Sequence, residues 1–102
     1  MLVRVLIERH FKAGREKEAL ELLLEMRKAA TRQIGYVSGE TLEDTQGPRT
    51  ILIMSTWHAL DDWRKWESSE EHRRLVSLID PMLEEPASVR ICVNPWDALA
   101  SE

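Results

Sequence analysis

The sequence lacks several features that would quickly assign a protein to a class. It has a single cysteine, Cys92, which excludes an internal disulfide and alone makes no metal site. Its neighbours indicate a half-buried strand residue, and nothing nearby favours the alternative of a reactive thiol. No run approaches the roughly 18 apolar residues that a membrane-spanning helix needs. No basic stripe is present and the net charge is −4, so nucleic acid is not an expected partner.

Signatures of common sites and of export are also missing. There is no glycine-rich phosphate loop, nucleophile elbow, HExxH or paired-cysteine motif, so no metal, nucleotide or other cofactor is expected. The N-terminus lacks the long apolar core of a signal peptide, because Arg4, Glu8 and Arg9 interrupt it. A cytoplasmic location is therefore the default expectation.

The residues that are present fit one folded domain. The chain has 102 residues, of which 43% are apolar and 31% charged, a balance typical of soluble globular domains. We expect a single domain over residues 1–102, with a core at about 2–94 and a C-terminal tail at 95–102.

Four segments have the composition of strands. Residues 2–11 are rich in β-branched and aromatic types, and Val3, Val5, Ile7 and Phe11 share one face by alternation. Gly39 in the second segment indicates a bulge or a close backbone approach. The predicted strands are 2–11, 35–44, 49–57 and 87–94.

Helices are predicted between these strands. In residues 15–32, Leu20, Leu23 and Leu24 recur at helical spacing, and a short helix is expected at 59–67. Ser68 and Glu71 fit a capping box that begins another helix, which Pro81 ends or kinks. Strand, helix, two strands, helix, strand is the split βαβ, or ferredoxin-like, order. This α+β fold carries both helices on one face of a four-stranded antiparallel sheet.

The uncovered face of this sheet predicts a second copy of the chain. Ile51, Leu52, Ile53 and Met54 put apolar groups on both faces of the third strand, and Leu6 adds to the uncovered side. Self-association into a homodimer is the commonest solution, and a monomer with a ligand groove on that face is the alternative. Pro95-Trp96 and Leu99 in the tail are candidate anchors on the partner.

Four short segments carry a resemblance to a known family. They are Phe11-Lys12-Ala13-Gly14, Gly35-Tyr36-Val37-Ser38-Gly39, Ile53-Met54-Ser55-Thr56-Trp57 and Asp62-Trp63-Arg64-Lys65-Trp66-Glu67-Ser68-Ser69. In order and spacing, the run from about residue 2 to 94 resembles the antibiotic biosynthesis monooxygenase (ABM) family of dimeric α/β barrel proteins. The resemblance implies homodimers whose sheets face each other and pockets for flat aromatic substrates. It also implies oxygenase activity without flavin or metal in several members.

A haem-degrading branch of the same superfamily uses an asparagine, a tryptophan and a histidine. By resemblance the tryptophan corresponds to Trp66, whereas the asparagine and histidine positions hold Ile7 and Val76. Two of the three groups are absent, so haem degradation by that route is not expected. His72 lies one turn before Val76 and faces a similar space.

Aromatic residues and one histidine are the candidates for chemistry. Trp57, Trp63 and Trp66 would wall a pocket against a planar ring, the alternative being core packing. His72 has a resting pKa suited to a general base, the alternative being a solvated residue in the first turn of a helix. His10 and His58 are expected at the surface.

Two arginines on neighbouring strands complete the candidate set. Arg4 and Arg90 are expected to point away from the helices, where they pair with Glu8 or Glu40 in a dimer or hold an anionic substrate. Met54 is placed with them as a substrate contact.

The sequence thus predicts a homodimeric, cofactor-independent monooxygenase of a small aromatic or quinol-like compound. Trp66 and His72 are its catalytic candidates. A non-catalytic dimeric module that binds a small ligand is the nearest alternative, followed by a degenerate haem binder.

Overall fold

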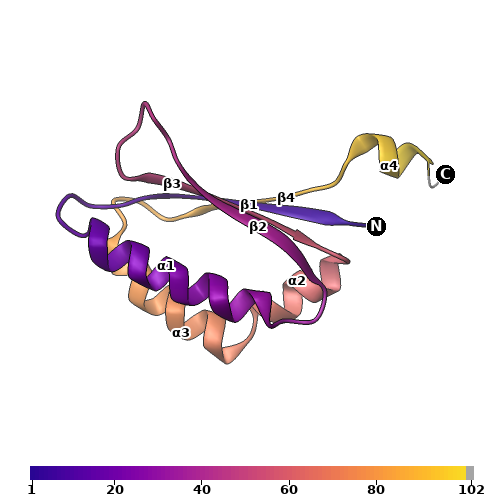
Figure 1. Ribbon diagram of the computed structural model, residues 1–102, viewed down its shortest axis with the longest axis horizontal. Helices are drawn as coiled ribbons and strands as arrows, with labels where there is room; N and C mark the ends of the chain where they lie inside the picture. The colour runs from indigo at the N-terminus through magenta and orange to yellow at the C-terminus, as the bar shows by residue number, and fades with distance from the viewer. Residues whose placement is uncertain (101–102) are drawn as a thin grey trace.

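The computed structural model describes residues 1–100 and contains one antiparallel sheet with a layer of helices on one face (Figure 1). The strands are β1 (Val3–His10), β2 (Tyr36–Glu43), β3 (Thr50–Trp57) and β4 (Ser88–Cys92), in the order β2-β3-β1-β4. The helices are α1 (Glu16–Thr31), α2 (Leu60–Glu67), α3 (Glu70–Ile79), the 3-10 turn η1 (Asp80–Met82) and α4 (Pro95–Ala100). The predicted ferredoxin-like α+β fold is confirmed.

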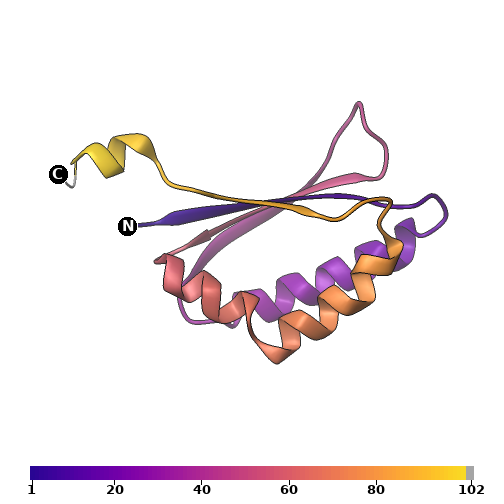
Figure 2. The ribbon, with the colours of Figure 1, turned by 180° about the vertical axis from the view of Figure 1, so that it is seen from behind.

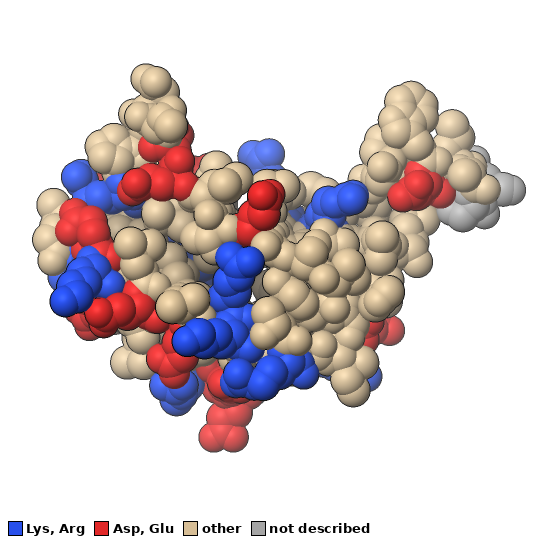
Figure 3. Space-filling view, viewed as in Figure 1, with Lys and Arg blue, Asp and Glu red and all other residues tan. Residues whose placement is uncertain are grey.

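Helices α1 and α3 lie side by side under the sheet, α1 on the side of β2 and α3 on the side of β4 (Figure 1 and Figure 2). Helix α1 and strand β2 lie nearest the viewer in Figure 1, and α3 and β4 do so from behind in Figure 2. Side chains of both charge signs lie over this layer in the view of Figure 3.

Alternation along β1 sets the inner face of the sheet. Val3, Val5 and Ile7 are buried beneath the helices, as predicted, and Phe11 is buried just beyond the strand. Arg9 continues the same alternation and is also buried, with 3% of its surface exposed.

Helix α1 packs through a different stripe from the one its leucines predicted. Leu23 is buried, but Leu20 and Leu24 are about half exposed. The buried stripe is Ala19, Leu23, Met26, Ala29 and Ala30. Small alanines at the contact let the helix approach the sheet closely, and the two flanking leucines fall outside it.

The start of α3 corrects the predicted capping box by one residue. Ser68 ends α2, because its Oγ donates to the Arg64 carbonyl at 2.8 Å. Ser69 takes the extended N-cap conformation, and its Oγ accepts a hydrogen bond from the backbone N–H of His72 at 3.2 Å. Pro81 lies in η1 and the α-helix ends at Ile79, as predicted.

Gly35 in the turn before β2 and Gly39 within β2 both occupy positions where a side chain would meet a neighbour. Gly35 has a φ of +89°, and a side chain at this position would collide with Asp62. The irregularity in β2 lies between Tyr36 and Ser38, not at Gly39. Gly39 instead gives room to the hydroxyl group of Tyr36, so its role is close approach.

The outer face of the sheet is only partly polar. We call this the open face; Leu6, Leu42, Leu52 and Met54 contribute its large apolar groups by strand register. Past β4 the chain extends away from the body to α4, where Trp96 is 74% exposed (Figure 1). The predicted tail therefore carries a short helix at 95–100, and its last two residues lie outside the described ones. In the described part of the chain, no helix has the length and apolarity to cross a bilayer.

Candidate functional site

Two hollows adjoin Trp63 and His72 on the inner side of the sheet. The first, called the α1 cleft, lies between α1, β2 and β3 and has a volume of about 50 Å³. The second, called the α3 cavity, lies between α3, β1 and β4 and has a volume of about 830 Å³. Ile7, Trp63 and His72 border both hollows.

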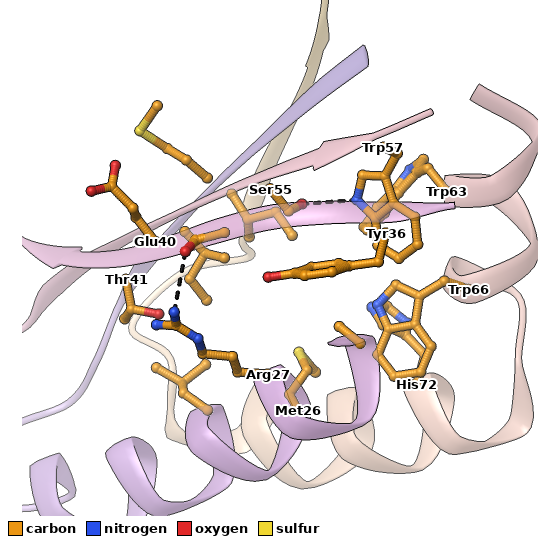
Figure 4. A pocket seen from close by; sticks show the side chains of 16 residues that line it. Met26, Arg27, Tyr36, Glu40, Thr41, Ser55, Trp57, Trp63, Trp66 and His72 are labelled. Atoms are coloured by element: carbon orange, nitrogen blue, oxygen red, sulfur yellow. Dashed lines mark hydrogen bonds between the residues drawn. The ribbon is translucent and has the colours of Figure 1, made fainter. Parts of the chain in front are cut away.

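The α1 cleft holds a chain of aromatic rings (Figure 4). Tyr36 packs edge-on against Trp57 at 5.4 Å between ring centroids, and Trp57 packs against Trp63 at 5.8 Å. Trp66 and Trp63 then meet His72 at 5.0 and 6.0 Å. Such edge-to-face pairs stabilise the fold beyond their buried area.

The size of the α1 cleft decides its role. Its volume of about 50 Å³ is far below the roughly 300–1,000 Å³ of small-molecule pockets. Trp57 is fully buried, and its Nε1–H donates to the Ser55 hydroxyl at 3.0 Å. Trp57 is therefore a core residue. Core packing was the alternative that the sequence left open for the tryptophans.

The α3 cavity has the size of a ligand site. Its apolar wall comes from β1, α3, the connection after η1, and β4; the contributing residues are Ile7, Val76, Leu83, Ala87 and Val89. Val89 is 47% exposed, so the cavity opens to solvent beside β4. Ile7 and Val76, at the asparagine and histidine positions of the haem-degrading branch, make this wall apolar.

His72 stands between the two hollows. It is the third residue of α3, its ring packs edge-on against both Trp63 and Trp66, and only 8% of its surface is exposed. Burial lowers the pKa of His72, and the charge of Arg9 lowers it further, while Glu67 acts in the opposite direction. The imidazole is therefore neutral at physiological pH and able to accept a proton. The solvated surface residue considered from sequence is not what the structure shows.

Arg9 is the site residue that sequence reasoning missed. Burial lowers its pKa, and the negative charge of Asp80 on η1 opposes that effect. Both residues line the α3 cavity. The signal was in the alternation that assigned Val3, Val5 and Ile7 to the inner face, because Arg9 is the next position along.

The other predicted substrate contacts lie elsewhere. Arg4 is exposed, and its register opposite Cys92 and Thr56 puts it on the open face. Arg90 lines a separate groove there with Leu6 and Leu52. Both arginines point away from the helices, as expected, and neither lines a hollow that His72 borders. Met54 borders the α1 cleft, but its register opposite Leu6 also puts it on the open face.

The remaining reactive groups are accounted for locally. His10 bonds to Thr50 Oγ1 at 2.9 Å and to the Glu8 carboxylate at 2.7 Å, and His58 is exposed. Cys92 is half-buried in β4, as predicted. The described residues contain no group of three or more His, Cys, Asp or Glu side chains arranged to hold a metal ion.

The strand order β2-β3-β1-β4, with the helices on one face of the sheet, places the chain among the ferredoxin-like α+β domains. The chain matches the profile of the antibiotic biosynthesis monooxygenase family over residues 2–78, and it belongs to that family. The resemblance seen in the sequence is thereby confirmed.

Individual relatives are distant. Protein SchA of Streptomyces halstedii is 26% identical over 91 residues, which cover 89% of this chain but only 24% of SchA. The chain thus spans about a quarter of that curated relative. A conserved protein from Methanosarcina mazei superposes with a TM-score of 0.86 at 13% identity, covering 90% of this chain and 91% of that one. SnoaB from Streptomyces nogalater, described as a cofactor-independent oxygenase, gives 0.82 at 12% identity, covering 91% and 92%. At such identities the structural likeness establishes the fold.

Proposed function

We propose that this protein is a homodimeric, cofactor-independent monooxygenase that oxidises a small aromatic, quinol-like compound in the α3 cavity. The observation that carries the proposal is His72, a buried and neutral imidazole on the wall of a solvent-open cavity of about 830 Å³ that has one apolar wall. Membership of the monooxygenase family and the likeness to SnoaB support the reaction class.

His72 supplies the proton transfer that such a reaction needs. Dioxygen reacts slowly with a neutral quinol but accepts an electron readily from its anion, so a base that removes the hydroxyl proton starts the chemistry. A substrate ring packed against Trp63 and the apolar residues of the cavity would have that face shielded from water, which helps to keep the anion reactive. Trp66 contacts His72 from the α1 side and holds the imidazole in place.

The reaction balances without an external reductant. A quinol and one O₂ give a hydroxyquinone and one water: one oxygen atom forms a new C–O bond and the other leaves as water. The quinol loses four electrons, two from its hydroxyl groups and two from the ring C–H bond. The proton taken by His72 ends in the water.

The homodimer rests on the open face and the C-terminal arm. The open face presents Leu6, Leu42, Leu52 and Met54, and α4 carries Trp96 and Leu99 away from the body. A partner's matching sheet would cover such a surface. In sedimentation velocity, Leu52→Lys should shift dimer to monomer, whereas Leu20→Lys on the outer side of α1 should not. A monomeric wild-type protein at high concentration would contradict the pairing.

Oxygen uptake tests the activity. A panel of hydroquinones is incubated with and without air, and both O₂ consumption and hydroxyquinone absorbance are followed. His72→Ala should abolish uptake, Trp66→Ala should reduce it by loosening the imidazole, and His58→Ala should leave it unchanged. Tight quinol binding with no oxygen consumption by the wild-type protein would instead identify a non-catalytic binding module.

A further inference from the structure

A single charged side chain interrupts the inner face of β1. Arg9 follows Val3, Val5 and Ile7 on that face and pairs in register with Ile51 of β3. Its exposure of 3% lies within the range of the hydrophobic core residues. A guanidinium group keeps its charge under almost all conditions, so this burial places a cation beneath the helices.

Arg9 has no partner that matches its burial. Its Nε and Nη1 atoms are buried and have no acceptor within the described part of the chain, and no carboxylate lies within 4 Å. The Nε1 of Trp63 is a third buried donor without an acceptor. Native proteins rarely leave buried donors unmatched, and such groups are concentrated where a ligand supplies the missing acceptor.

The unmatched donors lie at the α3 cavity. Arg9 and Trp63 both line it, together with His72 and the apolar wall of Ile7 and Val76. Nε and Nη1 belong to different edges of the guanidinium plane, so a carboxylate docked on either edge would meet one of them. The cavity thus combines a surface for a flat ring with three buried donor atoms that lack an acceptor among residues 1–100.

Carboxylates at the cavity mouth do not cancel this charge. Asp80, Glu84 and Glu85 are exposed, so water and salt screen them over a Debye length of about 8–10 Å. Glu67, a half-buried fourth carboxylate of the lining, is paired with Arg64 at 3.0 Å. Arg9 is shielded from solvent and acts in a medium of lower dielectric constant, where its interaction with a bound ion is stronger. The inner end of the cavity therefore favours an anion despite the acidic rim.

We infer that the α3 cavity takes an aromatic monoanion, with the anionic oxygen directed at Arg9 and the ring lying against Trp63. Arg9 is then the specificity-determining residue of the site. The inference rests on the cavity assigned above and narrows its substrates to compounds that carry a carboxylate or an ionised hydroxyl group. It also gives Arg9 a second effect, because a cation at that oxygen favours ionisation of the substrate.

A matched pair of probes tests this charge selectivity. 2-Naphthoate and 2-naphthamide have nearly the same size and shape, and only the first is charged. Their dissociation constants are measured by isothermal titration calorimetry with the intact protein. Wild-type protein should bind 2-naphthoate at least about tenfold more tightly, the effect expected of one charge-assisted hydrogen bond.

Two variants locate the source of the selectivity. Arg9→Met should remove the preference while 2-naphthamide still binds, and Arg15→Met, which removes the same charge at the exposed start of α1, should retain it. The Trp63 indole N–H resonance, assigned with Trp63→Phe, should move on addition of 2-naphthoate. This resonance and the two-probe comparison in the wild-type protein need no folded Arg9 variant.

Several results would overturn the inference. Equal affinity for the two probes in the wild-type protein, no binding of either, or an unchanged preference in Arg9→Met each contradict it. Failure of the proposed oxygenase is distinguishable, because there the charge preference persists while no quinol consumes oxygen. Conversely, oxygen uptake with neutral quinols and no charge preference would leave the oxygenase standing and remove this inference.

Discussion

The α1 cleft and the α3 cavity share Ile7, Trp63 and His72, yet they are built in opposite ways. In the cleft, ring packs on ring and Trp57 has its hydrogen bond to Ser55, which leaves about 50 Å³. In the cavity, Nε and Nη1 of Arg9 are buried without an acceptor among residues 1–100, beside about 830 Å³ of space. Interiors normally pack densely and satisfy their polar groups, so the first region stabilises the fold and the second departs from that rule as binding sites do.

The largest effect is expected on the α1 side. Trp57 is fully buried between Tyr36 and Trp63, so Trp57→Ala should lower the free energy of unfolding by about 3–5 kcal/mol. That is much of the roughly 5–15 kcal/mol typical of a domain. Urea unfolding followed by circular dichroism measures the loss. Leu20→Ala, on the outer side of α1, should change the free energy by under about 1 kcal/mol. A mild effect of Trp57→Ala would mean that the ring chain is not core.

On the α3 side, a substitution should raise the free energy of unfolding instead of lowering it. Arg9→Met keeps most of the side-chain volume and removes an unpaired buried charge, so it should raise the free energy of unfolding by about 1–3 kcal/mol. The same urea titration measures it. Arg9→Ala should gain less, because it also leaves a cavity. Destabilisation by Arg9→Met would show that Arg9 serves the structure, and the contrast between the two hollows would disappear.

A smaller effect on stability is expected from His72, which borders both the α1 cleft and the α3 cavity. Burial and Arg9 lower its folded pKa, so the unfolded chain binds the proton more readily. Stability from this group is complete above the ordinary histidine pKa of about 6.5 and is lost as the pH falls from there through the lower folded value. His72→Gln should flatten this acid limb, whereas His58→Gln should not. Unfolding curves across mildly acidic pH provide the measurement, and an unchanged limb in His72→Gln would contradict the assignment.

The contrast between the hollows also explains what sequence reasoning could and could not reach. The strand order, the inner face of β1 and the end of α3 at Pro81 follow from local rules of alternation and proline geometry, and the structure confirms them. His72 and Trp63 were identified as candidates, but not the cavity between them. That cavity lies between α3, β1 and β4, and its size depends on tertiary distances that no local pattern encodes. Arg9 was passed over because an arginine on an apolar face is read as exposed unless its neighbours are traced in space.

The smallest effect should come from Asp80, the carboxylate whose charge acts on Arg9 from the cavity mouth. Asp80 is exposed and its influence is screened, so Asp80→Asn should strengthen 2-naphthoate binding by only about two- to fivefold at low salt. Binding of 2-naphthamide should not change, since it carries no charge for Asp80 to repel. Calorimetry at low and high ionic strength separates the cases, and the gain should vanish in salt. A gain that persisted in salt, or appeared equally for the amide, would trace to altered cavity shape, and the field of Arg9 would no longer account for the difference between the two hollows.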